Sequence, residues 1–362
     1  MSSAAHADFA RQTGDTAAVS HTLDALRDLG FERVESRDAA FGAVRLGPAL
    51  WQVTAERPAM TTLVSIVALG PSRERIEEAI GRSLEEMHRL IDLLTRFDDA
   101  SPVSVLNATG RLGGPPPEVR TVVSHALHYH RLTRGAFDVS VAPLVDLFWN
   151  RLVRAAPVEP TPAEIADTLA RVGAGHVRLS RRRIDLARPG MRLTFDGIAK
   201  GYIVDAMCAE LDRAGVSRYL VNAGGDIRAR GMNARARPWT IAVENPWRRG
   251  EYTHGVGLTN SAVATSGNYE RFCDTARRYH HIVNALTGRS PAHCSSVSVV
   301  APTSMEADAL ATSVFVMGPR QGVAFIEALP GCACLVLDHE GGVHRSAAWP
   351  SATPLTGGNE TS

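Results

Sequence analysis

The stretch that decides the fold begins with Met191-Arg-Leu-Thr-Phe-Asp-Gly-Ile-Ala-Lys-Gly-Tyr202 and ends with Tyr219-Leu-Val-Asn-Ala-Gly-Gly-Asp226. Residues 191–195 are predicted to form a short strand, which the Pro189-Gly190 turn joins to a strand at 184–186. A helix is predicted from about 199 to 214, and residues 219–223 form a strand that stops at the glycine pair. Strands that alternate with helices, several of them joined by short turns, indicate mixed or antiparallel sheets packed with helices, an α+β fold.

The same alternation continues outward on both sides. Apolar residues three and four apart after Pro71 predict a helix that includes Met87, which we interpret as core filler. Thr161-Pro-Ala-Glu164 is a capping box that begins another helix. The other expected strands are within 50–70 and at 239–243, 296–301 and 333–337, and the other expected helices are 20–29, 118–133, 304–317 and 320–328.

No linker long enough to separate domains interrupts this pattern. Residues 51–347 are therefore expected to form one domain. They follow an N-terminal extension of unknown role, 1–50, and precede a flexible tail, 348–362.

The composition is that of an ordinary soluble protein. Apolar residues make up 44% and charged residues 21% of the 362 positions, and 39 basic residues balance 38 acidic ones. A net charge of +1 provides no global field for nucleic acid or for an anionic membrane, so neither is expected as a partner. No run approaches the roughly twenty apolar residues that a membrane span requires.

The cysteines and the N-terminus favour a cytoplasmic protein. The five cysteines are scattered without CxxC or zinc-knuckle spacing, which fits a reducing compartment. Cys332 and Cys334 lie two apart in an apolar run, so we expect core thiols in preference to a metal or redox pair. The first residues lack the basic start and apolar run of a signal peptide.

The usual nucleotide-binding signatures, a P-loop and a G-x-G-x-x-G after a strand, are missing, but two polar segments attract attention. In Gly135-Ala-Phe-Asp138, the aspartate either binds a ligand or caps a turn, and the pattern favours neither. In Asp196-Gly-Ile-Ala-Lys200, small residues enter a helix whose first amides favour an anion. Lys200 in that first turn indicates a nearby phosphate or carboxylate, with a solvated lysine as the equal alternative.

Two further groups are candidate metal ligands. Asp308 and Thr312 are four residues apart on one helix face, and both offer the oxygen atoms that Mg²⁺ prefers. His125 and His128 have helical spacing for a metal pair, but no carboxylate accompanies them, so a solvated pair is preferred. Neither pair is specific by itself.

Taken together and in order, these segments resemble the FAD:protein FMN transferase, or ApbE, family. The likeness extends from about Ala59 to Arg345. It rests on seven segments, namely 97–107, Phe137-Asp-Val-Ser-Val-Ala-Pro-Leu144, Gly197-Ile-Ala-Lys-Gly-Tyr202, Val221-Asn-Ala-Gly-Gly-Asp226, 264–271, His281-Ile-Val-Asn-Ala-Leu-Thr-Gly288 and Ala307-Asp-Ala-Leu-Ala-Thr312.

The resemblance implies an enzyme that uses Mg²⁺ and FAD, links FMN through a phosphoester to a Thr or Ser of a target flavoprotein, and releases AMP. It implies that Asp308, Thr312 and the carbonyl of Gly197 bind the metal, and that His281 and Lys200 take part in the chemistry. The positions implied for flavin-nucleotide binding are Met60, Phe97, Ala136, Phe137, Asp138, Thr194, Asp196, Lys200 and Val283.

The chain differs from the family pattern at several of these positions. Thr194 stands where the family has an acidic residue, and Asp196 substitutes for it if the two share a strand face. Thr61, Asn284 and Phe97 replace a glycine, an aspartate and a tyrosine that are common in the family. Two alternatives therefore remain open, a Mg²⁺-dependent FAD pyrophosphatase that gives FMN and AMP, and a non-catalytic FAD-binding protein.

Overall fold

The computed structural model describes residues 40–154, 158–248, 250–269 and 278–350. The helix expected at 20–29 and the residues after 350 lie outside these ranges. No helix in the described ranges is long and apolar enough to span a membrane.

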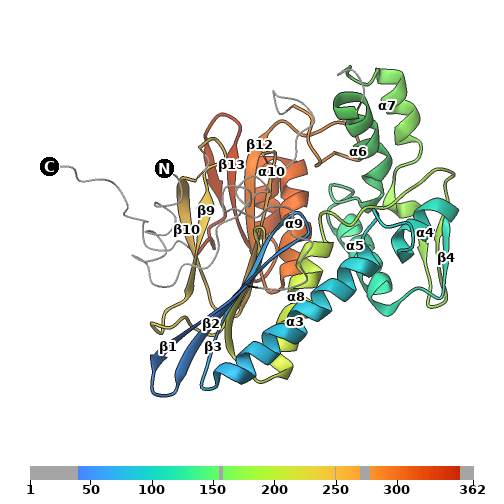
Figure 1. Cartoon of the computed structure of the whole chain (residues 1–362). Helices are drawn as coiled ribbons and strands as arrows, with labels where there is room; N and C mark the ends of the chain where they lie inside the picture. The colour runs from blue at the N-terminus through green and yellow to red at the C-terminus, as the bar shows by residue number, and fades with distance from the viewer. Residues whose placement is uncertain (1–39, 155–157, 249, 270–277, 351–362) are drawn as a thin grey trace.

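A nine-stranded sheet forms the centre of the described fold, and every neighbouring pair in it is antiparallel (Figure 1). The α+β prediction is therefore confirmed. In sheet order the strands are β1 (Ala40–Gly47), β2 (Leu50–Ala59), β3 (Thr62–Gly70), β7 (Arg218–Ala223), β8 (Asp226–Arg230), β11 (Ser261–Gly267), β12 (Cys294–Ala301), β13 (Ala333–Asp338) and β14 (Val343–Arg345).

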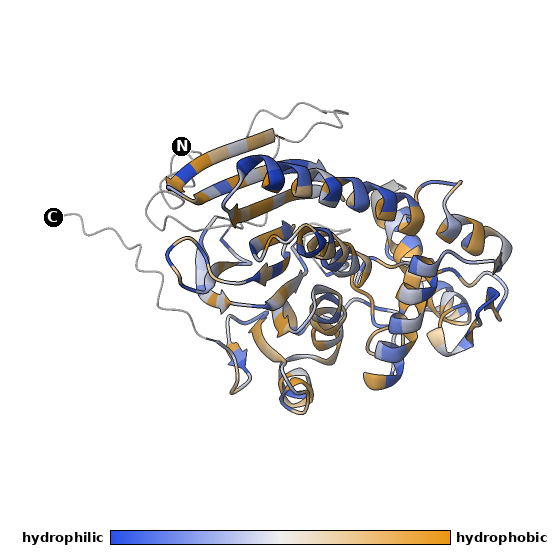
Figure 2. Cartoon of the chain, turned by 90° about the horizontal axis from the view of Figure 1, so that it is seen from below, coloured by the Kyte–Doolittle hydropathy of each residue, from blue (hydrophilic) through white to orange (hydrophobic). Residues whose placement is uncertain are grey.

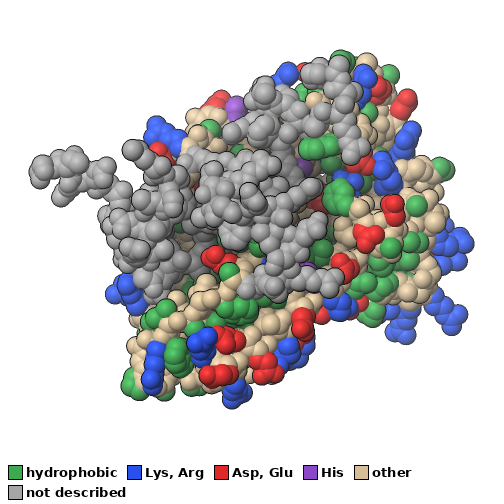
Figure 3. Space-filling model, viewed as in Figure 1, with side chains coloured by type: hydrophobic (Ala, Val, Ile, Leu, Met, Phe, Trp, Pro, Cys, Tyr) green, Lys and Arg blue, Asp and Glu red, His purple; other side chains and the backbone are tan. Residues whose placement is uncertain are grey.

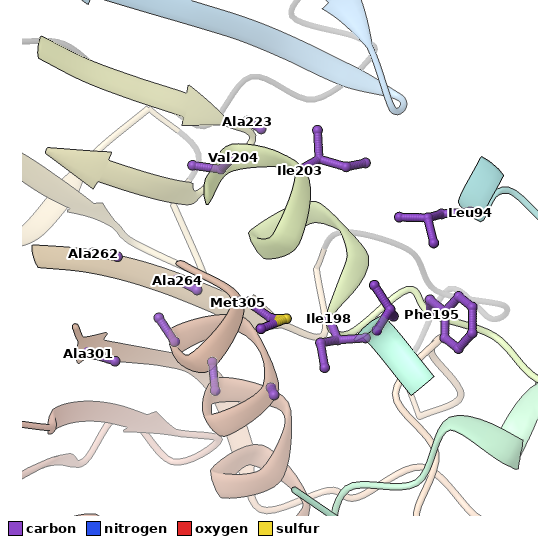
Figure 4. Packing of buried hydrophobic residues seen from close by; sticks show 14 of the residues in the cluster. Leu94, Phe195, Ile198, Ile203, Val204, Ala223, Ala262, Ala264, Ala301 and Met305 are labelled. Atoms are coloured by element: carbon purple, nitrogen blue, oxygen red, sulfur yellow. The ribbon is translucent and has the colours of Figure 1, made fainter. Parts of the chain in front are cut away.

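Four helices cover one face of this sheet, because each has an apolar side to bury. In α3 the predicted stripe is buried, and Met87 is fully enclosed, as expected of core filler. Figure 4 shows Ile203 of α8 near Leu94 of α3, and Met305 of α9 near Ile198. The four helices are α3 (Arg73–Leu94), α8 (Ala199–Arg213), α9 (Ser304–Met317) and α10 (Pro319–Glu327).

A second core lies on the opposite face, under the hairpin of β9 (Trp239–Glu244) and β10 (Tyr252–Leu258). Figure 2 shows that hydrophobic residues are frequent along the strands of the sheet. Trp349 joins this core although it belongs to the segment expected to be a flexible tail. At the other end, β1 pairs with β2, so the sheet begins before residue 51.

A smaller lobe lies beside the sheet, on the right in Figure 1. It contains a three-stranded sheet in the order β4-β6-β5 and several short helices. Its elements are α4 (Pro102–Thr109), β4 (Arg111–Gly113), α5 (Pro117–Leu132), the 3₁₀ turn Val139–Val141, α6 (Ala142–Trp149), the π-helical turn Asn150–Arg154, α7 (Pro162–Leu169), the 3₁₀ turn Ala174–His176, β5 (Val177–Leu179) and β6 (Arg183–Leu186).

The strand expected at 191–195 is the clearest error of the sequence reasoning. β6 pairs with β4 and β5, and residues 191–195 belong to no strand. The backbone N–H of Leu193 donates to the side-chain oxygen of Asn107, and that of Thr194 donates to the carbonyl of Val139, at 2.7 and 2.8 Å. The backbone N–H groups of this apolar, extended segment therefore find hydrogen-bond acceptors outside any β-sheet.

The cysteines of the described chain should be unreactive in the folded protein. Burial raises the pKa of Cys294 and Cys332 to about 12 and that of Cys334 to about 11, and Cys208 is also buried and free. With a thiol-specific chromogenic disulfide at neutral pH, we expect at most one fast-reacting thiol, since Cys273 lies outside the described ranges, and five after denaturation. Fast modification of two or more thiols in the folded protein would contradict this.

Candidate active site

One cavity of about 290 Å³ is lined by every residue to which the family resemblance assigned a catalytic, nucleotide-binding or metal-binding role, whereas His125 and His128 lie outside it. It lies where the β2–β3 turn, the first turns of α8, the second and third turns of α9, and the smaller lobe meet. The expected site residues that line the cavity are Met60, Phe97, Ala136, Phe137, Asp138, Thr194, Asp196, Gly197, Lys200, His281, Val283, Asp308 and Thr312. The fold therefore brings together side chains that are scattered along most of the sequence.

The expected metal ligands lie next to one another in this cavity. Asp308 is buried in the second turn of α9, and its Oδ2 accepts a hydrogen bond from the backbone N–H of Gly201 at 3.1 Å. Thr312 lies one turn further on, with its Oγ1 at 3.3 Å from the hydroxyl of Ser266. A methyl group on Gly197 would stand 2.9 Å from that Oγ1, so the backbone of Gly197 packs directly against Thr312.

Lys200 forms an ion pair with Asp226, the first residue of β8. Of the two interpretations of Lys200 that the sequence left open, the structure displays a nearby carboxylate, although Asp226 was not among the expected site residues. The signal was present in the Gly224-Gly225-Asp226 motif, but the sequence alone does not show that β8 lies beside the start of α8. Asp226 is 1% exposed, and burial raises its pKa while the Lys200 ammonium opposes that shift.

Buried carboxyl groups outnumber basic side chains at this end of the cavity. Burial raises the pKa of Asp308 well above its usual range, and the nearby carboxylate of Asp226 adds to the shift. One ammonium, that of Lys200, therefore faces two buried carboxylates. A bound divalent cation would offset this imbalance, so the donor set fits Mg²⁺. Within the described ranges no group of three or more His, Cys, Asp or Glu forms a metal-binding cluster, and an ion here would need oxygen from substrate phosphates.

Asp138 lines the cavity but directs its oxygens at the protein. Its Oδ1 accepts from the backbone N–H and the hydroxyl of Ser140 at 2.8 and 2.5 Å, and its Oδ2 accepts from the backbone N–H of Ala174 at 2.9 Å. The imidazole Nδ1 of His130 lies 3.3 Å from Oδ2. Of the two interpretations that the sequence left open, the structure displays the capping one.

The loop that carries His281 and Val283 is attached to the smaller lobe. Tyr279 stacks on Phe148 of α6 with ring centroids 5.1 Å apart, and its hydroxyl donates to Glu159 at 2.8 Å. Val283 packs in the same small core as Phe148. These contacts hold the loop against the smaller lobe, and His281 lines the cavity.

The two phenylalanines differ in what they offer a ligand. Phe97 is 72% exposed, and the guanidinium carbon of Arg96 lies 4.6 Å from its ring centroid. Phe137 is 2% exposed and packs edge-on against Tyr129 in the main core. Phe97 is therefore available for stacking on an aromatic ring system, whereas Phe137 forms part of the wall.

Residues 60–336 match the model of the ApbE family. The chain belongs to the ApbE family. The resemblance inferred from the sequence is thereby confirmed. Among curated members, the chain is 33% identical to an FAD:protein FMN transferase of Haemophilus influenzae and 28% identical to one of Salmonella typhimurium. The alignments cover 70% and 79% of this chain, and 76% and 84% of the relatives.

Solved ApbE structures have the same fold. The flavin transferase ApbE from Vibrio cholerae superposes with a TM-score of 0.69 at 28% identity, over 86% of this chain and 98% of the other. The ApbE protein of Thermotoga maritima gives 0.74 at 29% identity, over 82% of this chain and 97% of the other. The likeness therefore includes both the sheet and the smaller lobe.

Two departures from the ApbE pattern have structural consequences. Thr194 is buried while Asp196 is exposed, and residues 191–195 form no strand, so the expectation that the two share a strand face is wrong. Both nevertheless line the cavity. At the β2–β3 turn, Met60 and Thr61 have φ of 51° and 62°, the left-handed values of a two-residue hairpin loop. A β-branched residue is strained there.

Replacing Thr61 by glycine should therefore stabilise the protein. We expect Thr61→Gly to raise the free energy of unfolding by about 0.5–1 kcal/mol, because relief of left-handed strain exceeds the entropy that glycine adds to the unfolded chain. Thr253→Gly in β10 is the matched control and should destabilise, since Thr253 has no positive φ. Urea denaturation measures both; a destabilised Thr61→Gly variant would show that this turn is not strained.

Proposed function

We propose that this chain transfers the FMN half of FAD to a Thr or Ser hydroxyl of a target flavoprotein, in a Mg²⁺-dependent reaction that releases AMP. Flavin transfer is the activity that the names of the curated relatives share. The observation that carries the proposal is the cavity itself, whose lining combines an ion-paired lysine, buried carboxyl groups and a histidine.

Asp308, Thr312 and the carbonyl of Gly197 would hold the Mg²⁺. When bound, the ion supplies positive charge that neutralises the pyrophosphate of FAD and favours the departure of AMP. The N-terminal turn of α8 presents backbone amides and Lys200 toward the same phosphates. Asp226 holds the ammonium in place by its ion pair.

The transfer step uses the remaining groups of the cavity. The hydroxyl oxygen of the acceptor attacks the FMN phosphorus, and the phosphorus–oxygen bond to AMP breaks as the new phosphoester forms. His281 accepts the hydroxyl proton, because an imidazole titrates near neutral pH. Phe97 stacks on a ring of FAD, and Met60, Ala136, Thr194, Asp196 and Val283 form the walls.

The partner is a flavoprotein domain in the cytoplasm or one that faces it. The four buried, free cysteines of the described chain support a reducing compartment. Expression of the chain with a C-terminal fluorescent tag, followed by cell fractionation, tests this location. Recovery in the periplasmic fraction would contradict it.

One assay separates this function from its alternatives. The protein is incubated with FAD and Mg²⁺, with and without candidate flavoproteins, and the products are resolved by chromatography and intact-protein mass spectrometry. A transferase adds the mass of FMN to an acceptor and releases AMP in equal amount. Free FMN and AMP without modified acceptor would indicate a pyrophosphatase, and FAD bound without AMP release would indicate a binding protein.

A further inference from the structure

A second cavity, of about 820 Å³, lies in the smaller lobe beside the first. Its walls are the end of α4, the three-stranded sheet and the loop 187–191. Four arginine side chains line it, whereas Asp185 is the one carboxylate among its described lining residues. We call it the arginine cleft, and its arginines are Arg111, Arg178, Arg183 and Arg188.

The strand register places Arg111 and Arg178 on the outer face of the sheet, whereas Arg188 follows β6 and donates to the carbonyl of Val172 at 2.6 Å. Asp185 in the central strand β6 stands opposite Arg111 of β4 and Arg178 of β5. The alternate residues Ile184 and Leu186 are buried in the core, so the face that carries Asp185 is the outward one. The guanidinium Nε atoms of Arg111 and Arg183 each lie 2.8 Å from a different oxygen of Asp185.

Positive charge in the cleft thus exceeds what Asp185 can pair. Within the described part of the chain, no carboxylate forms an ion pair with Arg178 or with Arg181 and Arg182 at the tip of the β5–β6 hairpin. The side chains of Arg111 and Arg183 stay 68% and 58% exposed. Figure 3 shows Lys and Arg side chains along the edge where Figure 1 draws α4 and β4. This local excess contrasts with the near-neutral charge of the whole chain.

The segment 191–194 links the arginine cleft to the catalytic cavity. Asn107 lines the cleft, and its side chain holds Leu193 by two hydrogen bonds of 2.7 and 2.9 Å. Met191 lines the cleft and Thr194 lines the catalytic cavity. Met191 and Thr194 are three residues apart, and three residues of extended chain span at most about 11 Å. A bound polypeptide segment of about ten residues is therefore long enough to reach both cavities.

From this placement we infer that the arginine cleft binds an acidic segment of the acceptor protein while the acceptor hydroxyl enters the catalytic cavity. The inference rests on the proposed function, since a protein acceptor is what requires recognition outside the cavity. Arginine pairs with carboxylates through two parallel hydrogen bonds, so a segment rich in Asp or Glu fits these side chains. Exposed charges of this kind accelerate encounter and select partners.

The direct test measures binding of a fluorescein-labelled decaglutamate peptide by anisotropy at low ionic strength. The double variant Arg178→Gln/Arg183→Gln should bind the peptide about tenfold more weakly than the unaltered protein, and salt should weaken binding by the latter. The control is Arg75→Gln/Arg320→Gln, which removes two exposed arginines from α3 and α10 and should bind normally. Unchanged FAD affinity and thermal melting would show that the cleft variant is folded.

Equal peptide binding by all three proteins, or no binding by the unaltered one, would overturn the inference. Arginine-dependent binding to vesicles of phosphatidylglycerol and phosphatidylcholine, or to single-stranded DNA, with none to decaglutamate would replace it with a membrane or nucleic-acid surface. With an acceptor in hand, the cleft variant should raise KM for the acceptor and leave kcat and the KM for FAD unchanged. If the unaltered protein modifies no acceptor, the proposed function fails, whereas equal KM values in an active pair reject only the cleft.

Discussion

Gly201→Ala should unfold the protein or destabilise it by about 3 kcal/mol or more, which makes it the most damaging single-methyl change that we expect. A Cβ at this position would stand 2.6 Å from the carbonyl carbon of Ser304 and 2.7 Å from Cα of Met305. Both are backbone atoms, so neither can rotate away. Helices α8 and α9 would have to separate, and they carry Lys200 and Asp308 at their facing ends.

The control for this prediction is Gly81→Ala in α3. No atom lies within 4 Å of the Cβ that this substitution would add, and glycine in a helix interior costs about 1 kcal/mol relative to alanine. Gly81→Ala should therefore stabilise the protein. The two substitutions are expected to change the free energy of unfolding in opposite directions, although both glycines lie in helices. Thermal and urea denaturation followed by circular dichroism measure the difference. A Gly201→Ala protein with normal stability would show that α8 and α9 are not in close contact.

Asp308→Asn should lower Mg²⁺-dependent turnover of FAD by about 10²-fold or more, because it removes the one carboxylate of the proposed metal site. Asparagine keeps the shape of the side chain and an oxygen that accepts the Gly201 N–H, so the fold should survive. Calorimetric titration of Mg²⁺ in the presence of FAD should show weaker binding. Asp167→Asn, an exposed carboxylate on α7, is the control and should leave turnover unchanged.

One experimental outcome would contradict the role of Asp308 as a metal ligand. If Asp308→Asn retained full turnover with the same dependence on Mg²⁺, Asp308 would not be a ligand, and the acidic group would serve only to position Lys200. A variant that lost FAD binding without Mg²⁺ would indicate a direct contact with the nucleotide. Steady-state rates over a range of Mg²⁺ concentrations, together with FAD binding in a chelator, distinguish these results.

The helices were the most accurately predicted elements. α8, α9 and α10 lie within a residue or two of the expected ranges, and α3 begins shortly after Pro71 as expected, because a 3.6-residue apolar period and local capping signals are contained in contiguous sequence. The sequence pattern missed seven of the described strands, namely β1, β4, β5, β8, β10, β11 and β14. β10 contains two glycines in Tyr252-Thr-His-Gly-Val-Gly-Leu258, and its pairing with β9 compensates for a weak local pattern.

In the site, too, contacts between residues close in sequence were predictable, and contacts between distant residues were not. Asp308 and Thr312 were predictable as neighbours because four residues make one helical turn, and they do lie together in the cavity. The ion pair of Lys200 with Asp226 was not, because it joins α8 to β8 through the order of strands in the sheet. Asp138 shows the same limit, since its partner Ala174 lies on a distant turn.

The stretch from Met191 to Asp226 illustrates what each level determined. The sequence by itself determined the helix, the strand after it and the glycine turn before Asp226, because these depend on the periodicity and conformational limits of adjacent residues. Only the tertiary structure decided that residues 191–195 form no strand, that Gly201 packs against α9, and that two buried carboxylates face one lysine. Those features depend on contacts between segments that are far apart in the sequence, and these contacts are set by the packing of the whole chain.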